Sequence, residues 1–288
     1  MTHSPTAIRR LLADHGLEPS RALGQNFVAD ANTVRRIARL ARVAPGDRVV
    51  EIGAGLGSLT LALLEAGADV TAVEVDRHLV PILREVVEPL GAIVVHADAM
   101  TVDWEAVLGP VDPGRPWTLV ANLPYNIATP LVLDLLEAVP QIERMLVMVQ
   151  LEVGERLAAH PGDRANGIPP VKAAWWASVR IIGKVPPTVF IPAPRVESAL
   201  VELERHPPVA DDLERARVFS LVEKGYNQRR KMLRRSLAPD ATPAAFAAAE
   251  VRPEARAEEL SLADWRRLTR AVGAVGAPGG VDRPPNTT

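Results

Sequence analysis

The chain has 288 residues, a hydrophobic content of 48% and a formal net charge of −2. This length suffices for one large α/β domain and a smaller one, and the near-neutral charge provides no global attraction to a polyanion. The sequence shows no apolar stretch of membrane-spanning length and no secretory leader. Cysteine is absent, which excludes disulfides, thiolate metal sites and a cysteine nucleophile. We therefore expect a cytoplasmic enzyme without a bound metal.

The N-terminal region predicts two helices separated by a stretch without periodicity. Residues 6–15 have the apolar spacing of a short amphipathic helix that ends at Gly16. Residues 21–28 lack any period, and composition alone indicates a connecting loop. Asp30 then predicts the N-cap of a second helix, which carries arginines on its polar face.

A strand, a glycine turn and a helix follow, in the order that opens a nucleotide-binding α/β domain. Residues 48–52 predict a buried strand, and Gly53 and Gly55 permit close approach of the backbone to a ligand. The G-x-G-x-G spacing differs from the dinucleotide fingerprint, so no pyrophosphate needs to be bound. The next predicted strand, 69–73, ends before Glu74, which is placed to accept both hydroxyl hydrogens of a ribose.

Two further predicted strands also end in polar side chains. Residues 92–96 lead to Asp98, which can either accept from an adenine amine or cap the following turn. The apolar run 118–121 leads to Asn122. These polar strand ends recur at intervals of ~20–25 residues, which is typical of successive βα units in one parallel sheet.

The segment after the fourth strand combines three chemical groups. Asn122 has an amide, the carbonyls of Leu123 and Pro124 need partners outside a regular sheet ladder, and Tyr125 has a flat aromatic face. Acceptors on both N–H bonds of an exocyclic amine localise its lone pair, and a stacked ring holds the base in place. The alternative is a simple strand-ending turn, since Asn and Pro are common turn residues.

The C-terminal half predicts a change of domain. Two final strands are expected between residues 181 and 203, around a proline-rich loop. We expect a first domain over residues 1–205, a small all-helical domain over 206–275 and a disordered tail over 276–288.

A basic cluster lies in the predicted helical domain. Arg229, Arg230, Lys231, Arg234 and Arg235 fall within seven residues, and on a helix they would form two adjacent basic rows. Such a cluster is either a solvated face or a contact surface for phosphates.

Five ordered motifs carry a resemblance to a known family. The chain resembles the ribosomal RNA adenine N6-dimethyltransferases, which are class I S-adenosylmethionine-dependent methyltransferases with a Rossmann-like α/β domain and a small C-terminal helical domain. The matching segments are Leu-Gly-Gln-Asn-Phe-Val at 23–28, Glu-Ile-Gly-x-Gly at 51–55 with Glu74 and Asp98, Asn-Leu-Pro-Tyr at 122–125, Phe-Ile-Pro-Ala-Pro-Arg-Val-Glu-Ser at 190–198, and Asn-Gln-Arg-Arg-Lys at 227–231. Within the family, the segments at 24–27, 125–130 and 227–231 look most like those of the enzymes that modify small-subunit rRNA.

The resemblance implies roles for individual residues. Cofactor contacts are implied for Asn26, Val28, Gly53, Gly55, Glu74, Asp98 and Asn122. Catalytic roles are implied for Asn122, Leu123, Pro124, Tyr125 and Phe190, with Tyr125 and Phe190 packing on the target base. RNA contacts are implied for Arg195, Arg229, Arg230, Lys231 and Arg234.

The expected reaction is N6,N6-dimethylation of two adjacent adenines in the 16S rRNA of immature 30S subunits, by a monomeric enzyme that uses S-adenosylmethionine. One alternative is a resistance-type methyltransferase of large-subunit rRNA, which shares the Asn-Leu-Pro-Tyr motif. A nicotinamide-dependent dehydrogenase is disfavoured by the glycine spacing. A non-catalytic assembly factor on the same scaffold is disfavoured by the intact Glu74 and Asn122.

Overall fold

The computed structural model describes residues 2–20, 23–124 and 127–275, which divide into two compact units. The first unit contains residues 1–158 and 176–207, and the second contains 159–175 and 208–288. The predicted tail 276–288 lies outside the described residues. Within the described residues, no helix has the length and apolar composition that a membrane crossing requires.

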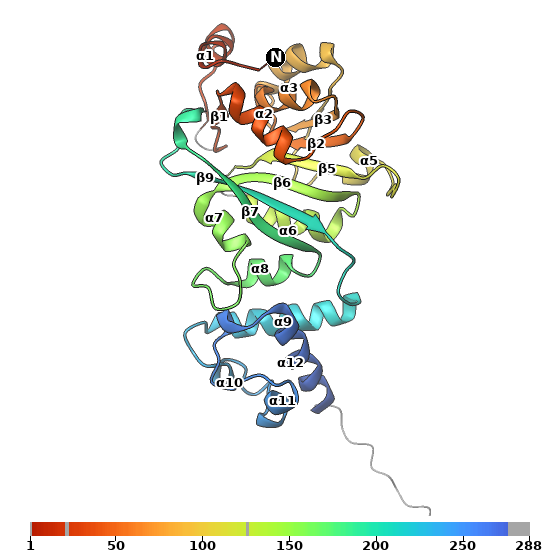
Figure 1. Cartoon of the computed structure of the whole chain (residues 1–288), viewed down its shortest axis with the longest axis vertical. Coiled ribbons are helices and arrows are strands. Elements are labelled where there is room, and N and C mark those ends of the chain that lie inside the picture. Colours follow the sequence, from red (N-terminus) through yellow and green to blue (C-terminus); the bar gives the residue numbers. More distant parts are fainter. Residues whose placement is uncertain (1, 21–22, 125–126, 276–288) are drawn as a thin grey trace, which may run out of the picture. The chain divides into compact units, whose positions relative to one another are not determined.

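The first unit is built on a seven-stranded sheet (Figure 1). Its strand order is β4-β3-β2-β5-β6-β9-β7, with β4 to β6 parallel and the last two strands antiparallel. The strands are β2 (Arg48–Ile52), β3 (Asp69–Glu74), β4 (Ile93–His96), β5 (Trp117–Asn122), β6 (Ile142–Gln150), β7 (Ala177–Val185) and β9 (Ser198–Arg205). This arrangement confirms the predicted Rossmann-like class.

Helices connect the parallel strands in the usual crossover manner. They are α3 (Ser58–Glu65), α4 (Leu79–Val87), α5 (Trp104–Leu108) and α6 (Ala128–Ala138), preceded by α1 (Pro5–Asp14) and α2 (Ala31–Leu40) and followed by α7 (Leu151–Leu157), with short 3₁₀ turns η1 (Glu88–Leu90) and η2 (Pro187–Val189). Asp30 caps α2 as predicted, because its carboxylate accepts from the Thr33 N–H at 2.7 Å.

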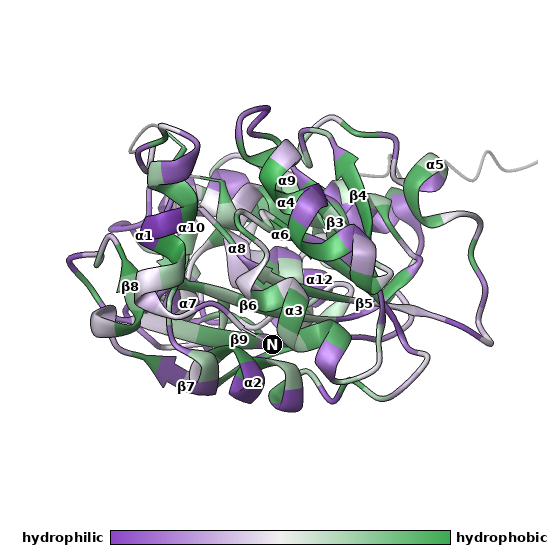
Figure 2. Cartoon of the chain, turned by 90° about the horizontal axis from the view of Figure 1, so that it is seen from above, coloured by the Kyte–Doolittle hydropathy of each residue, from purple (hydrophilic) through white to green (hydrophobic). Residues whose placement is uncertain are grey.

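Burial explains why the central strands are mostly apolar. The middle residues of β2 and β5 are almost fully buried, as expected for strands covered on both faces. In Figure 2 the strands β5 and β6 are mostly green, whereas α2 shows both purple and green segments. The sequence prediction did not include β6, and it placed two strands where the structure has β7, β9 and the short β8 (Phe190–Ile191).

The N-terminal segment is attached to the sheet unit by its own small ladder. Strand β1 (Phe27–Val28) pairs antiparallel with β8, and Phe27 lies opposite Ile191. Helix α1 buries Ile8 and Leu12 in a hydrophobic cluster that also contains Phe27. The stretch before α2 is therefore packed against the unit, although its sequence has no periodicity.

The second unit is helical, as expected, but its boundary differs from the prediction. Its helices are α8 (Ile168–Ala173), α9 (Asp212–Asn227), α10 (Leu233–Ser236), α11 (Pro243–Ala248), the 3₁₀ turn η3 (Ala257–Glu259) and α12 (Leu262–Val275). Residues 159–175, predicted to belong to the first domain, belong to this unit. The cause is tertiary: Trp175 is 1% exposed and meets Phe219 edge-on, and the Asn166 amide donates to the Glu258 carbonyl at 2.8 Å.

Candidate functional site

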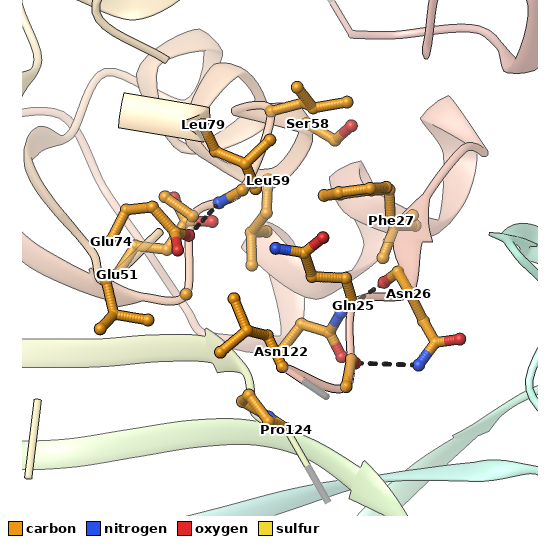
Figure 3. Close-up of a pocket in the computed structure, with 18 residues that line it drawn as sticks. Gln25, Asn26, Phe27, Glu51, Ser58, Leu59, Glu74, Leu79, Asn122 and Pro124 are labelled. Atoms are coloured by element: carbon orange, nitrogen blue, oxygen red, sulfur yellow. Dashed lines mark hydrogen bonds between the residues drawn. The ribbon is translucent and has the colours of Figure 1, made fainter. Parts of the chain in front are cut away.

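A pocket of about 670 Å³, open to solvent, lies at the carboxyl ends of β2, β3 and β5 (Figure 3). The chain leaves β2 toward β3 on one side and places β5 on the other, so this is the topological switch point where open α/β sheets bind ligands. Figure 3 shows Glu51 and Glu74 on one side of the pocket, with Gln25, Asn26 and Phe27 facing them. Residues 23–28, the glycine turn, Glu74 and Asn122 all contribute to the lining.

The glycine turn is shaped by backbone conformation and by packing. Gly55 and Gly57 have positive φ values of 59° and 83°. A Cβ on Gly55 would lie 3.0 Å from the Phe27 ring, and one on Gly57 would lie 2.9 Å from the Val87 side chain. The sequence predicted that these glycines let the backbone approach a ligand closely. In the structure, the missing Cβ atoms also leave room for the side chains of Phe27 and Val87.

Glu74 is held by two backbone donors at the end of β3. Its Oε2 accepts from the Gly55 N–H at 2.7 Å, and its Oε1 accepts from the Asp76 N–H at 2.9 Å. Burial raises the pKa of this carboxyl, and the two N–H donors oppose that shift. A carboxylate has about four acceptor sites, so Glu74 retains acceptor capacity beyond its backbone donors. The arrangement suits a ligand with two neighbouring hydroxyl groups.

Glu51 is a second acid in the pocket wall, and the sequence analysis assigned it no individual role. The side chain is 2% exposed, and the Thr60 hydroxyl donates to its Oε2 at 2.6 Å. Burial, together with the neighbouring charge of Glu74, raises the pKa of Glu51 to about 8, and the hydrogen bond from Thr60 opposes this shift. The available sequence signal was an acid within the otherwise apolar run Val-Val-Glu-Ile of a buried strand.

Asn122 ends β5 and borders the pocket, as predicted. Its Nδ2 donates to the backbone carbonyl of Asn26 at 3.0 Å, which leaves Oδ1 as an acceptor. The Pro124 carbonyl accepts from the N–H groups of Ile127 and Ala128 at the start of α6. Among the described residues, none donates to the carbonyl of Leu123. Two acceptors, Asn122 Oδ1 and Leu123 O, thus stand next to each other in the sequence without a donor.

The N-terminal wall brings Asn26 and Val28 to the pocket, as the resemblance implied. The Asn26 amide donates to the Gly24 carbonyl at 3.0 Å, and Val28 is buried in the β1–β8 ladder. Gln25 also lines the pocket, although the sequence analysis gave it no role of its own.

Four predicted catalytic or cofactor residues are not part of the described lining, and the first of them, Leu123, is buried. Asp98 is exposed, and its Oδ1 accepts from the Met100 N–H at 2.9 Å, so in this structure it caps the turn. Phe190 is 3% exposed and lies in the hydrophobic core, so its predicted stacking on a base stays a prediction. Tyr125 lies outside the described residues.

The predicted basic helix is wrong in its geometry. Helix α9 ends at Asn227, Arg229 to Lys231 lie in the following turn, and Arg234 lies in the separate short helix α10, so the basic side chains form no continuous rows. Arg229 donates to Glu258 at 2.7 Å, and Arg234 lies 3.3 Å from Glu254.

Other basic residues lack such ion pairs. Arg230 and Lys231 are exposed and have no acidic partner among the described residues. In the first unit, Arg195 is exposed in the loop between β8 and β9. The basic cluster of the second unit therefore has fewer unpaired positive charges than its sequence indicated, because Arg229 and Arg234 form ion pairs.

The pocket fits an adenosine-bearing cofactor such as S-adenosylmethionine. The Glu74 carboxylate retains acceptor capacity beyond its backbone donors, which suits the hydroxyl groups of a ribose. Leu59 and Leu79 provide apolar surface in the same pocket.

Comparisons with known proteins agree with this assignment. The family model described as ribosomal RNA adenine dimethylase matches residues 18–272. The chain is 50% identical to ribosomal RNA small subunit methyltransferase A of Leifsonia xyli subsp. xyli, covering 92% of this chain and 96% of that protein. It is 48% identical to the protein of the same name from Thermobifida fusca, covering 92% and 94%.

Two solved structures have the same fold as this chain. The crystal structure of the 23S rRNA methyltransferase ErmE is similar with a TM-score of 0.67 and 28% identity, covering 86% of this chain and 100% of that one. A dimethyladenosine transferase from Plasmodium falciparum, with a TM-score of 0.68 and 21% identity over 83% and 94% of the two chains, shares the fold. The chain belongs to the ribosomal RNA adenine dimethylase family and is an S-adenosylmethionine-dependent methyltransferase.

Proposed function

We propose that this chain dimethylates N6 of two adjacent adenines in small-subunit rRNA, acting as a cytoplasmic monomer on immature 30S subunits. The curated relatives named as small-subunit methyltransferases are 48–50% identical to it over more than nine tenths of its length. The solved 23S rRNA methyltransferase is 28% identical. This difference in identity favours the small-subunit substrate over the large-subunit one.

The observation that carries the chemistry is that Asn122, in the pocket wall, and the adjacent Leu123 each have an acceptor oxygen that no donor among the described residues uses. Asn122 Oδ1 and the Leu123 carbonyl can accept the two N–H bonds of an adenine amine, which localises the nitrogen lone pair for attack. When bound, S-adenosylmethionine supplies a methyl group on a sulfonium centre. The protein therefore needs to align and polarise the amine, and the described pocket offers acceptors for that task.

In this proposal the cofactor is held by residues on both sides of the pocket. Glu74 accepts the ribose hydroxyls, the turn at Gly53 and Gly55 brings backbone close to the ligand, and Asn26 and Val28 form the facing wall. Asp98 follows the neighbouring strand β4 and is exposed, so it remains a proposed contact for the adenine amine of the cofactor.

RNA binding is assigned to exposed basic side chains. Arg195 belongs to the loop that follows β8, and Arg230 and Lys231 belong to the second unit. Arg229 and Arg234 are proposed contacts as well, but each would first have to exchange a carboxylate partner for a phosphate. The target adenine must leave its stack, which requires binding energy from such contacts elsewhere on the RNA.

The test is methyl transfer by wild type, Asn122→Ala and a matched control. Mass spectrometry of rRNA, after incubation with S-adenosylmethionine and immature small subunits, should show dimethyladenosine only in small-subunit rRNA for the wild type. Asn122→Ala should lower the rate by about 100-fold or more, because the amine is left unpolarised and misaligned.

Asn32→Ala, an exposed site on α2, is the control and should retain activity. S-adenosylmethionine affinity should fall less than the rate in Asn122→Ala, because the Glu74 contacts remain. Primer extension on both rRNAs distinguishes the large-subunit alternative. Appreciable turnover by Asn122→Ala, or modification of large-subunit rRNA alone, would refute the proposal.

A further inference from the structure

Gln25 lies in the N-terminal pocket wall and uses both ends of its side-chain amide. Its Oε1 accepts from the Ser20 N–H at 2.7 Å, and its Nε2 donates to Asp76 Oδ2 at 2.7 Å. The second bond joins residues that are 51 positions apart in the sequence. It is charge-assisted because the acceptor is a carboxylate, and such bonds are shorter and stronger than neutral ones.

Asp76 is in turn bound to the wall that contains Glu74. Its own N–H donates to Glu74 Oε1 at 2.9 Å, and its Oδ1 accepts from the His78 N–H at 2.9 Å. Both oxygens of Asp76 are therefore engaged, one by the turn before α4 and one by Gln25. The Gln25 amide thus connects two walls of the pocket through Asp76. Figure 3 shows Gln25 and Glu74 on opposite sides of this pocket.

The residue after Gln25 contacts the catalytic segment. The backbone carbonyl of Asn26 accepts from Asn122 Nδ2 at 3.0 Å, a bond between residues 96 positions apart. This bond fixes which end of the Asn122 amide is free, since a rotation by half a turn would place Oδ1 against the Asn26 carbonyl. Adjacent Cα atoms are about 3.8 Å apart, so a displacement of Gln25 also moves the Asn26 carbonyl.

We propose that Gln25 is a positioning residue for methyl transfer. Through its bridge to Asp76 it holds the Asn26 carbonyl, and this carbonyl holds the Asn122 amide with Oδ1 available to the target amine. The inference rests on the proposed function of Asn122. It extends that function, because it assigns the orientation of the catalytic amide to a side chain whose own amide is engaged by Ser20 and Asp76.

The bridge can be tested by reversing its polarity. Gln25→Glu keeps an acceptor for Ser20 but places two carboxylates against each other. Asp76→Asn leaves one oxygen for two donors, those of Gln25 and His78. In the double variant Gln25→Glu/Asp76→Asn, the new amide donates to Glu at position 25 and its oxygen accepts from His78. The direction of the hydrogen bond is then reversed and every partner is satisfied.

The measurement is the single-turnover rate of methyl transfer at saturating S-adenosylmethionine and immature small subunits, well below the melting temperature of each variant. Gln25→Glu should be about tenfold slower or worse, since misplacement of reacting groups by about 1 Å can lower rates 100-fold. The double variant should recover to within about threefold of wild type, as expected for directly coupled sites. A role in stability alone would lower the melting temperature and leave this rate unchanged.

Asn32→Asp adds the same negative charge at an exposed site on α2, and its rate should equal that of wild type. If Gln25→Glu does not fold, Gln25→Met replaces it, because methionine has a similar length and neither hydrogen bond. A folded Gln25 variant with the wild-type rate overturns the inference, and so does a double variant as slow as Gln25→Glu. Failure of the wild type to methylate small-subunit rRNA would instead refute the proposed function.

Discussion

The two backbone donors on Glu74 allow a sharp prediction for Glu74→Gln. Both carboxylate oxygens accept a backbone N–H, from Gly55 at 2.7 Å and from Asp76 at 2.9 Å. A glutamine has only one oxygen, so its NH₂ group must face one of these donors. The position that loses its oxygen can no longer accept from a ribose hydroxyl, and each such charge-assisted bond contributes about 1.5–3 kcal/mol. Affinity for S-adenosylmethionine should therefore fall at least about tenfold, which corresponds to about 1.4 kcal/mol.

Folding stability should change less than cofactor affinity. Burial raises the pKa of Glu74, so its charged form is disfavoured in the folded protein, and a neutral amide avoids that cost. Isothermal titration calorimetry with S-adenosylmethionine, together with thermal unfolding, measures both quantities. Glu85→Gln on the exposed face of α4 is the matched control and should bind normally. A folded Glu74→Gln protein with unchanged affinity would remove Glu74 from the cofactor site.

Two further predictions concern a buried acid and the basic surface. The pKa of Glu51 is about 8 in the folded protein, whereas that of an ordinary glutamate is 4.5, so between these pH values the native state retains a proton that the unfolded chain has lost. Stability of the wild type relative to Glu51→Gln should then fall by about 1.4 kcal/mol per pH unit across that window, measurable by urea unfolding; a constant difference would contradict the burial of a protonated Glu51. Replacement of Arg230 and Lys231 with Gln should reduce the log–log salt slope of binding to small subunits by about 0.7–0.9 per lost phosphate contact, with unchanged S-adenosylmethionine affinity. An unaltered slope would place the RNA surface elsewhere.

Much of the catalytic unit follows from local sequence patterns. Short apolar runs predicted the strands β2, β3 and β5, because strands buried on both faces are apolar. Asp30 predicted the start of α2. Since parallel strands end at the same edge of a sheet, the positions of Glu74 and Asn122 after two such strands already indicated one shared pocket. These features depend on interactions of short range or on a repeated connection, so the order of residues is sufficient to reveal them.

Other features depend on contacts between distant residues. The sequence predicted a basic helix, but α9 ends at Asn227 and the basic residues that follow lie in a turn. There Arg229 forms an ion pair with Glu258. Residues 159–175 belong to the second unit because Trp175 packs against Phe219 of that unit. Neither outcome follows from periodicity, because both are decided by which side chains meet after folding.

The sequence alone determined the class of fold, the strand ends that carry the pocket and the family resemblance. Only the tertiary structure showed that Gln25 reaches Asp76 and that the Asn26 carbonyl orients Asn122. It also showed that Thr60 donates to the buried Glu51. The physical reason is that a hydrogen bond between side chains far apart in the sequence leaves no periodic signal, since its strength depends on distances and directions that exist only in the folded chain.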